Sequence, residues 1–170
     1  MKIMFASDIH GSAYYAEKLR EAYMSSGAER LVLLGDLLYH GPRNDLPREY
    51  APKRVIEILN SMKEDILCVR GNCDTEVDQM VLDFPIMADY AVLMPDGKTI
   101  YLSHGHIYNP LNPPKLKKGD ILMNGHTHIR AFEEYDGFTY INPGSVSIPK
   151  DGKGNSCMIY ENGKFEFMNL

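Results

Sequence analysis

The chain has 170 residues, of which 44% are hydrophobic, and carries a formal net charge of −5. This length and apolar content predict one domain, residues 1–170, with a substantial core. The acidic balance argues against a surface for general contact with nucleic-acid phosphates, and no apolar run approaches the roughly 18 residues of a membrane span.

The cysteines and the first apolar run favour a cytoplasmic location. Cys68, Cys73 and Cys157 show no disulfide spacing, which is typical of a reducing compartment. Asp8 and His10 interrupt the first apolar run before it is long enough for a signal peptide. We therefore expect a cytoplasmic protein that is not held in a membrane.

The N-terminal part of the chain predicts strands and helices in alternation. Residues 3–7 form an apolar run of the length of a buried strand. Ser12 is a candidate N-cap for a helix whose apolar residues recur at helical spacing and which stops at Gly27. A second strand is expected at residues 31–34.

A polar loop at residues 39–51 separates this strand from the next helix. Pro52 suits the first turn of that helix, which is expected to run through Met62. A third strand is expected at residues 65–69. The order of strand, helix, strand, helix and strand predicts right-handed crossovers in a mainly parallel sheet.

The C-terminal part of the chain has the pattern of β-hairpins. Tight-turn signals occur at Asp96-Gly97, Asp136-Gly137 and Asn162-Gly163. Four further strands are expected, at residues 100–103, 121–124, 139–142 and 157–160. Both parts of the chain carry candidate ligands, so we expect them to close on one site.

Candidate metal-binding side chains directly follow five of the predicted strands, and these places contain five of the six histidines. In an α/β sheet, ligands bind beyond the carboxyl ends of the strands, so these side chains are expected to meet at one rim. The five segments are Asp8-Ile9-His10, Gly35-Asp36, Gly71-Asn72-Cys73-Asp74, His104-Gly105-His106 and Gly125-His126-Thr127-His128.

The number of donors indicates two metal ions. One ion rarely takes seven side chains, whereas two ions receive four each if Asp36 bridges them. Imidazole and carboxylate donors without thiolate suit Mn, Fe, Co, Ni or Zn rather than Ca. The seven candidate metal ligands are Asp8, His10, Asp36, Asn72, His104, His126 and His128.

In combination, these segments resemble the calcineurin-like metallophosphoesterase superfamily, and more narrowly the small bacterial YfcE-type phosphodiesterases. The likeness extends over nearly the whole chain. It is carried by the five ligand segments together with Phe5-Ala6-Ser7-Asp8-Ile9-His10-Gly11-Ser12, His40-Gly41-Pro42-Arg43-Asn44, Val69-Arg70-Gly71-Asn72-Cys73-Asp74 and Asn142-Pro143-Gly144-Ser145-Val146-Ser147-Ile148-Pro149.

The resemblance implies a fold and a distribution of ligands. The fold is an α/β four-layer αββα sandwich of the metallo-dependent phosphatase type, with a dinuclear site at the top of two facing sheets. One metal is expected to bind Asp8, His10, Asp36 and His128, and the other Asp36, Asn72, His104 and His126. Manganese is the usual activating ion of the bacterial members, with Zn, Fe, Ni and Co as alternatives.

Two divalent ions suit hydrolysis of a small phosphodiester, because a water that bridges them loses a proton near neutral pH and attacks phosphorus. Asn72, with Arg43 or His106, is expected to neutralise charge on the phosphoryl oxygens. Cys73 stands where many superfamily members have a leaving-group acid, so the identity of the general acid stays open. Asp74 is a candidate carboxylate for orienting a ligand histidine.

Two alternatives remain open from the sequence. One is a non-catalytic, protein-binding scaffold, the role that the retromer subunit of this fold has in eukaryotes. The other is an enzyme with a different substrate, a phosphomonoester or a nucleic acid. Exposed apolar residues at hairpin edges make a homo-oligomer a further expectation.

Overall fold

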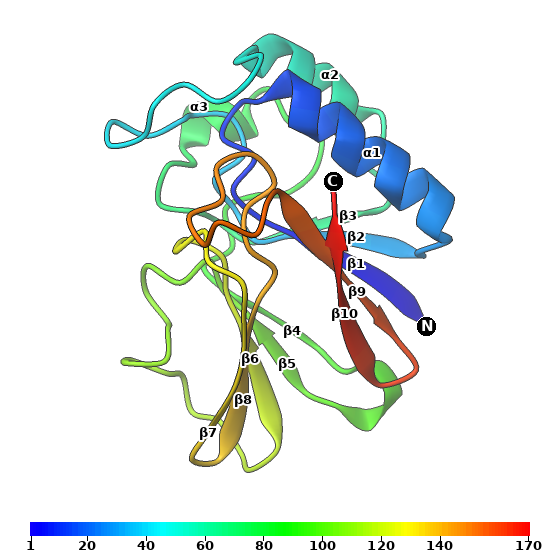
Figure 1. Ribbon diagram of the computed structural model, residues 1–170, viewed down its shortest axis with the longest axis vertical. Coiled ribbons are helices and arrows are strands. Elements are labelled where there is room, and N and C mark those ends of the chain that lie inside the picture. The colour runs from blue at the N-terminus through cyan, green and yellow to red at the C-terminus, as the bar shows by residue number, and fades with distance from the viewer.

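The computed structural model describes all 170 residues and places a β-α-β-α-β unit at the N-terminal end of the chain (Figure 1). Its strands β1 (Lys2–Ala6), β2 (Arg30–Leu33) and β3 (Ile66–Cys68) are parallel neighbours, as predicted. The Ser12 side chain caps α1 (Ala13–Ser26) and Gly27 ends it in the left-handed conformation. Pro52 begins α2 (Pro52–Asn60), and a short α3 (Glu76–Gln79) follows β3.

Two antiparallel strands from the C-terminus complete the first sheet. β9 (Ser156–Glu161) pairs with β1 and β10 (Lys164–Asn169) pairs with β9, so the order is β10-β9-β1-β2-β3. The sheet is therefore mixed, and only its β1-β2-β3 part is parallel. Asn162-Gly163 forms the turn between β9 and β10, as its sequence predicts.

The second sheet has the order β4-β5-β6-β8-β7. β5 is parallel to β6 and β6 to β8, whereas β4-β5 and β7-β8 are hairpins at the predicted turns. The turn at Asp96-Gly97 includes a short 3₁₀ segment (Pro95–Gly97). The strands are β4 (Ala91–Leu93), β5 (Ile100–Leu102), β6 (Asp120–Met123), β7 (Ala131–Tyr135) and β8 (Phe138–Asn142).

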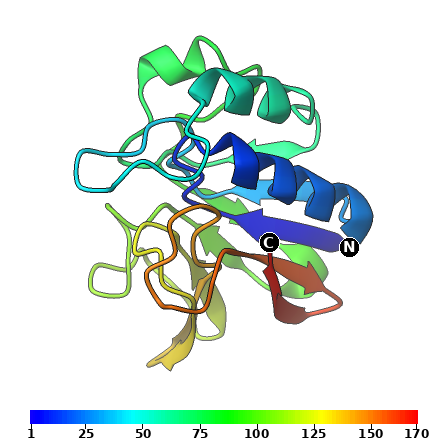
Figure 2. The same cartoon turned by 45° about the horizontal axis from the view of Figure 1, so that its top comes forward.

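Alternation along β1 divides the core into two layers. Ile3 and Phe5 pack between the sheets, whereas Met4 and Ala6 face α1 and α2. All three α-helices lie on the outer side of the first sheet (Figure 2). The expected α/β sandwich is confirmed, but a loop at residues 105–119, rather than a helix, lies on the outer side of the second sheet.

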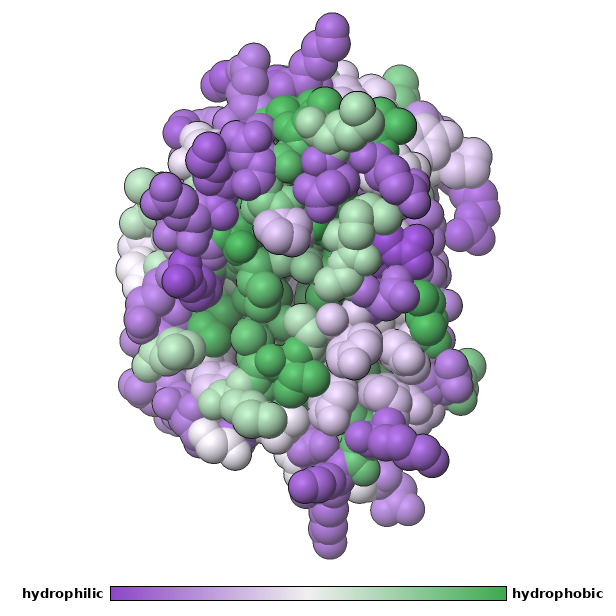
Figure 3. Space-filling model, turned by 180° about the vertical axis from the view of Figure 1, so that it is seen from behind, coloured by the Kyte–Doolittle hydropathy of each residue, from purple (hydrophilic) through white to green (hydrophobic).

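The edge strands β3 and β4 border a hydrophobic hollow of about 480 Å³. Ile66 and Leu67 of β3 and Leu93 of β4 line it, and hydrophobic side chains gather on this side of the molecule (Figure 3). None of the helices combines the length and the hydrophobicity that a membrane crossing requires.

Candidate metal centre

Side chains from four strand ends meet around Asp36, which follows β2. Asp36 Oδ2 lies 3.3 Å from His104 Nε2 and 3.6 Å from His10 Nε2. His104 Nε2 also lies 3.0 Å from the amide oxygen of Asn72 and 3.2 Å from His126 Nδ1. Asp36 therefore contacts histidines from both of the predicted ligand sets.

The other ligand set surrounds Asp8 at the end of β1. Asp8 Oδ1 lies 3.5 Å from His10 Nε2 and 3.3 Å from His128 Nε2. The two histidine nitrogens are 3.2 Å apart. The structure thus brings all seven predicted ligands together in two adjoining groups that share Asp36.

Backbone carbonyls orient three of the histidines. The Nδ1–H of His10 donates to the carbonyl of Tyr39 (2.7 Å), that of His104 to Leu34 (2.6 Å) and that of His128 to Ile148 (2.6 Å). Each ring then directs Nε2, which carries a lone pair in the neutral form, toward the centre.

This arrangement fits bound cations. In their neutral forms, His10 and His128 present two lone pairs only 3.2 Å apart, which a cation between or beside them stabilises. Asp8 Oδ1 is buried without a hydrogen-bond partner. Buried acceptors that face one another without donors are the ligands that divalent metals take.

Backbone strain is concentrated in the same residues. Of the eight non-glycine residues with positive φ, five are candidate ligands: Asp8, His10, Asp36, His126 and His128. A non-glycine residue in the left-handed region costs about 1–2 kcal/mol, so such residues persist only where the surrounding structure holds them. The fold therefore maintains strained backbone where these side chains converge.

The charges of the centre depend on one another. Burial alone would raise the pKa of Asp8, but contacts with His10 and His128 hold that pKa well below its usual range. Burial opposes the charged form of His104, but Asp36 and Asp8 raise its pKa to about 9. In the absence of metal, a proton on His104 therefore neutralises part of the carboxylate charge at pH 7.

Metal affinity is consequently expected to rise with pH. His104 must lose its proton to bind a metal through Nε2, so below pH 9 this group alone should weaken the apparent affinity about tenfold per pH unit. The stability of the metal-free protein is expected to change in the opposite direction. The raised pKa of His104 stabilises the folded state fully below about pH 6.5, and this contribution to the free energy of unfolding is lost as pH rises through 9. Competition with a colorimetric chelator between pH 6 and 9 measures the affinity, and a pH-independent affinity would contradict the assignment of His104.

Asp74 holds the backbone of the centre rather than a ligand histidine. Its carboxylate accepts hydrogen bonds from the N–H groups of Asp36 (2.9 Å), Leu37 (2.9 Å) and Gly71 (2.7 Å). Burial raises its pKa, although these three donors oppose the shift. The sequence interpretation of Asp74 was therefore wrong in its contact, because the carboxylate joins the segments after β2 and β3.

The segment at residues 142–148, the end of β8 and the loop after it, holds the backbone of Asp8 in a similar way. The hydroxyl groups of Ser145 (2.9 Å) and Ser147 (3.1 Å) both donate to the carbonyl of Asp8. The Asn142 amide donates to the carbonyl of Gly125, beside His126 (2.7 Å). The sequence showed only that Asn142-Pro143-Gly144-Ser145 favours a turn. It could not show the hydrogen-bond partners, because Asp8 lies more than 100 residues away and Gly125 lies in another loop.

The centre opens into a small pocket of about 50 Å³. Arg43 and Cys73 line this pocket, as predicted for residues near a substrate, and so do Asn44 and Lys150, which the sequence interpretation had not singled out. Burial, together with the negative charge of Asp36, raises the pKa of the Cys73 thiol to about 12.

His106 lies beside His104 and His126 and is not among the residues that line this pocket. Its ring centroid is 5.5 Å from that of His104 and 6.4 Å from that of His126. Burial, followed by the positive charge of His104 and Arg70, lowers the pKa of His106. Its Nδ1 is buried and has no hydrogen-bond partner in the chain.

Comparisons with known proteins agree with this geometry. The sequence profile described as "Calcineurin-like phosphoesterase superfamily domain" matches residues 1–164. Phosphodiesterase YfcE of Escherichia coli K12 is 49% identical over 162 residues, which cover 95% of this chain and 88% of the relative. A solved structure of the E. coli phosphoesterase Yfce, also 49% identical, superimposes with a TM-score of 0.93 over 95% of this chain and 89% of the other.

A more distant relative shares the fold. The structure of Vacuolar Protein Sorting 29 from Cryptosporidium parvum is 18% identical, with a TM-score of 0.64 over 98% of this chain and 95% of that chain. At this identity the likeness shows a common architecture alone.

Proposed function

Because this chain belongs to the calcineurin-like phosphoesterase superfamily, we propose that it is a phosphodiesterase that holds two divalent metal ions across Asp36. The single observation that supports this most directly is the position of Asp36 Oδ2, between His104 Nε2 at 3.3 Å and His10 Nε2 at 3.6 Å. Asp8, His10 and His128 would hold one ion with Asp36, and Asn72, His104 and His126 the other.

The chain's own residues prepare the chemistry. When bound, two divalent ions lower the pKa of a shared water and stabilise charge on the phosphoryl oxygens. Asn72 turns its amide oxygen toward His104. Its amide nitrogen donates one hydrogen bond to Cys73 Sγ at 3.3 Å, which leaves its second N–H for a phosphoryl oxygen. Arg43 lies at the pocket and provides a planar guanidinium for the same group. His106, whose ring centroid lies 5.5 Å from that of His104, is a further candidate for contact with the substrate.

Cys73 is a poor proton donor at neutral pH. General acids work best when their pKa lies near the working pH, and the pKa of this thiol is about 12. We therefore expect wild-type activity to favour diesters whose leaving group needs no protonation.

Substitution of Cys73 by His tests this expectation. An imidazole beside Asn72 would supply a proton, so Cys73→His should raise kcat/KM for a diester with an alkyl leaving group by about 10-fold or more. The p-nitrophenyl diester, whose leaving group is already stable as an anion, should change little. Equal effects on both substrates would rule out an acid role at this position, and Cys73→Ser serves as the matched control.

Three further properties are part of the proposal. We expect manganese as the activating ion, because histidine, carboxylate and amide oxygen ligands are compatible with it. A cytoplasmic location is supported by three unpaired cysteines, of which Cys68 and Cys157 are buried. A homo-oligomer is also expected, with the hollow between β3 and β4 as one apolar surface for contact.

A substrate panel on metal-stripped and reconstituted enzyme tests the function. We expect manganese to restore hydrolysis of bis(p-nitrophenyl) phosphate, with a kcat/KM at least 10-fold above that for p-nitrophenyl phosphate. Preference for the monoester would identify a phosphatase instead. Two bound ions without turnover of any ester would support a binding scaffold, which the complete set of seven donors disfavours.

A further inference from the structure

The outer face of the second sheet carries a pocket that the proposed chemistry does not use. Tyr101 of β5 pairs in register with Leu122 of β6. Their neighbours Ile100, Leu102 and Ile121 belong to the core between the sheets, so Tyr101 and Leu122 point to the other face. These two side chains form the floor of the pocket.

Two further tyrosines form its walls. Tyr90 and Tyr108 meet edge to face, with ring centroids 6.1 Å apart and ring planes at 89°. Pro114 and Lys115 of the loop at residues 105–119 complete the lining of a pocket of about 210 Å³. Tyr90 is 56% exposed although its ring is apolar, so it contributes surface to this pocket rather than to the core.

The segments that build the pocket also carry residues of the candidate metal centre. Ser103, which lines the pocket, directly precedes His104, and Tyr108 follows His106 by two residues. Tyr90 is next to Asp89, whose carboxylate pairs with Arg70 at 2.8 Å, and Arg70 leads to Gly71 and Asn72.

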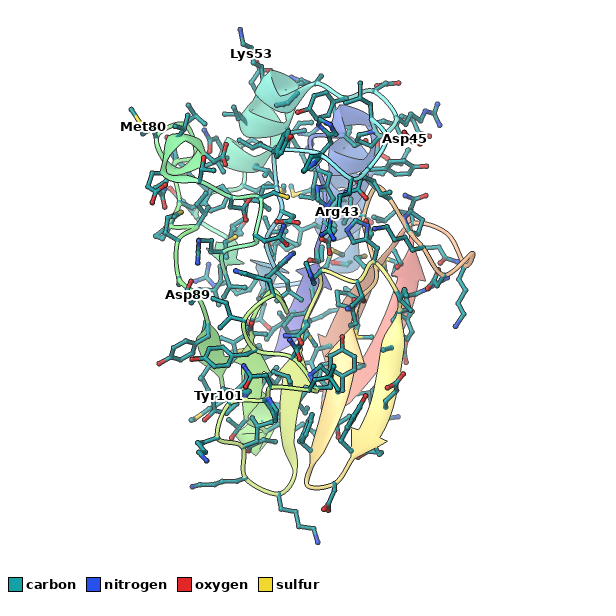
Figure 4. All side chains as sticks on the ribbon, turned by 90° about the vertical axis from the view of Figure 1, so that its left-hand side faces the viewer. Arg43, Asp45, Lys53, Met80, Asp89 and Tyr101 are labelled. Atoms are coloured by element: carbon teal, nitrogen blue, oxygen red, sulfur yellow. The ribbon has the colours of Figure 1, made fainter.

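The pocket and the centre therefore open on neighbouring parts of one face. Figure 4 labels Arg43, which lines the pocket of the centre, Tyr101, which lines the tyrosine pocket, and Asp89, the neighbour of Tyr90. Three residues of extended chain separate Tyr101 from His104, which corresponds to about 10 Å. The phosphate and the base of one nucleotide lie within such a distance of each other.

On the basis of the proposed function, we propose that this tyrosine pocket binds the nucleobase of a small nucleotide phosphodiester whose phosphate lies at the metal centre. Its volume is below the roughly 300–1,000 Å³ of sites that enclose a whole drug-sized ligand, so it suits one flat ring system. Tyrosine rings stack on any base, and the Lys115 ammonium can donate to ring nitrogen or carbonyl acceptors. The net charge of −5 favours a short ester over a long nucleic acid.

Two ligands that differ only by the base test this proposal. Adenosine 5′-monophosphate and ribose 5-phosphate present the same phosphate and sugar, and calorimetry on manganese-loaded protein gives both affinities without requiring turnover. Wild type should bind the adenosine compound about 10-fold more tightly, which is the typical effect of one stacked base. Tyr108→Leu should reduce this ratio to about twofold or less and leave the affinity for ribose 5-phosphate unchanged.

Additional variants make the result decisive. Tyr90→Leu should reduce the ratio of the two affinities to the same extent. Because Tyr90 is largely exposed, this variant should fold even if Tyr108→Leu does not. Tyr135→Leu is the matched control, since Tyr135 stacks on Phe138 in the β7–β8 hairpin and is absent from the pocket. The proposal would be overturned if wild type bound both ligands with equal affinity, or if neither Tyr108→Leu nor Tyr90→Leu changed the ratio of the two affinities.

Hydrolysis of bis(p-nitrophenyl) phosphate, measured in parallel, separates this inference from the proposed function. If the wild-type enzyme hydrolyses the diester but does not discriminate between the two ligands, the pocket assignment fails and the phosphodiesterase assignment stands. If discrimination depends on Tyr108 and Tyr90 but no ester is hydrolysed, the pocket assignment stands and the function is wrong.

Discussion

Replacement of Asp36 by Asn is expected to remove at least one metal ion and to lower kcat/KM for a phosphodiester by about 10³-fold, since one catalytic metal is worth several kcal/mol. The substitution keeps the shape of the side chain and removes the charge that faces His10 and His104. Metal content by mass spectrometry and turnover of bis(p-nitrophenyl) phosphate measure the two effects.

Asp136→Asn provides the matched control for this variant. Asp136 lies exposed in the turn of the β7–β8 hairpin, so the same change of charge there leaves the centre untouched. We expect wild-type metal content and rate for Asp136→Asn. Unchanged metal content and rate in Asp36→Asn itself would remove the bridging assignment.

Replacement of Gly71 by Ala is expected to disrupt the centre from the backbone. A Cβ at this position would lie 2.1 Å from Asp36 Oδ1 and 2.3 Å from the backbone nitrogen of Asp36. That nitrogen donates to Asp74, so it cannot move without loss of a buried hydrogen bond. We expect a loss of about 3 kcal/mol in the free energy of unfolding, the upper range for overpacking, and a metal affinity at least 10-fold weaker.

Gly119→Ala separates steric disruption from a general loss of stability. A Cβ at Gly119 meets no atom within 4 Å, although its φ of +91° makes alanine unfavourable by about 1–2 kcal/mol. This control should unfold at a lower denaturant concentration than wild type and still bind two metals. Denaturant unfolding of chelator-treated proteins gives both stabilities. A Gly71→Ala protein with normal metal affinity would show that the close approach of the two loops is not required.

The placement of the ligands could be predicted because each follows an apolar run directly. Asp8 and Asp36 come after short apolar runs that are typical of buried strands, and parallel strands bring their carboxyl ends to one edge. Turn signals such as Asn162-Gly163 were equally informative, because two successive residues that tolerate positive φ favour the tight turn of a hairpin. Each strand-end ligand and each hairpin turn is specified by a few consecutive residues, so the sequence alone was enough to predict it.

The residues that support the centre could not be predicted in the same way. Asp74 binds three backbone N–H groups in two loops, and Ser145 and Ser147 bind the carbonyl of Asp8 from the far end of the chain. Such contacts depend on how the loops pack, which no local pattern specifies. The tyrosine pocket could not be predicted from the sequence for the same reason, because Tyr90 and Tyr108 come into contact only in the folded chain.

The most direct measurement for the whole interpretation is anomalous diffraction from crystals soaked in manganese. We expect two peaks per chain, about 3.5–4 Å apart, with the Asp36 carboxylate in contact with both. A single peak, or two peaks of which only one is bound by Asp36, would contradict the dinuclear site on which the proposed activity depends.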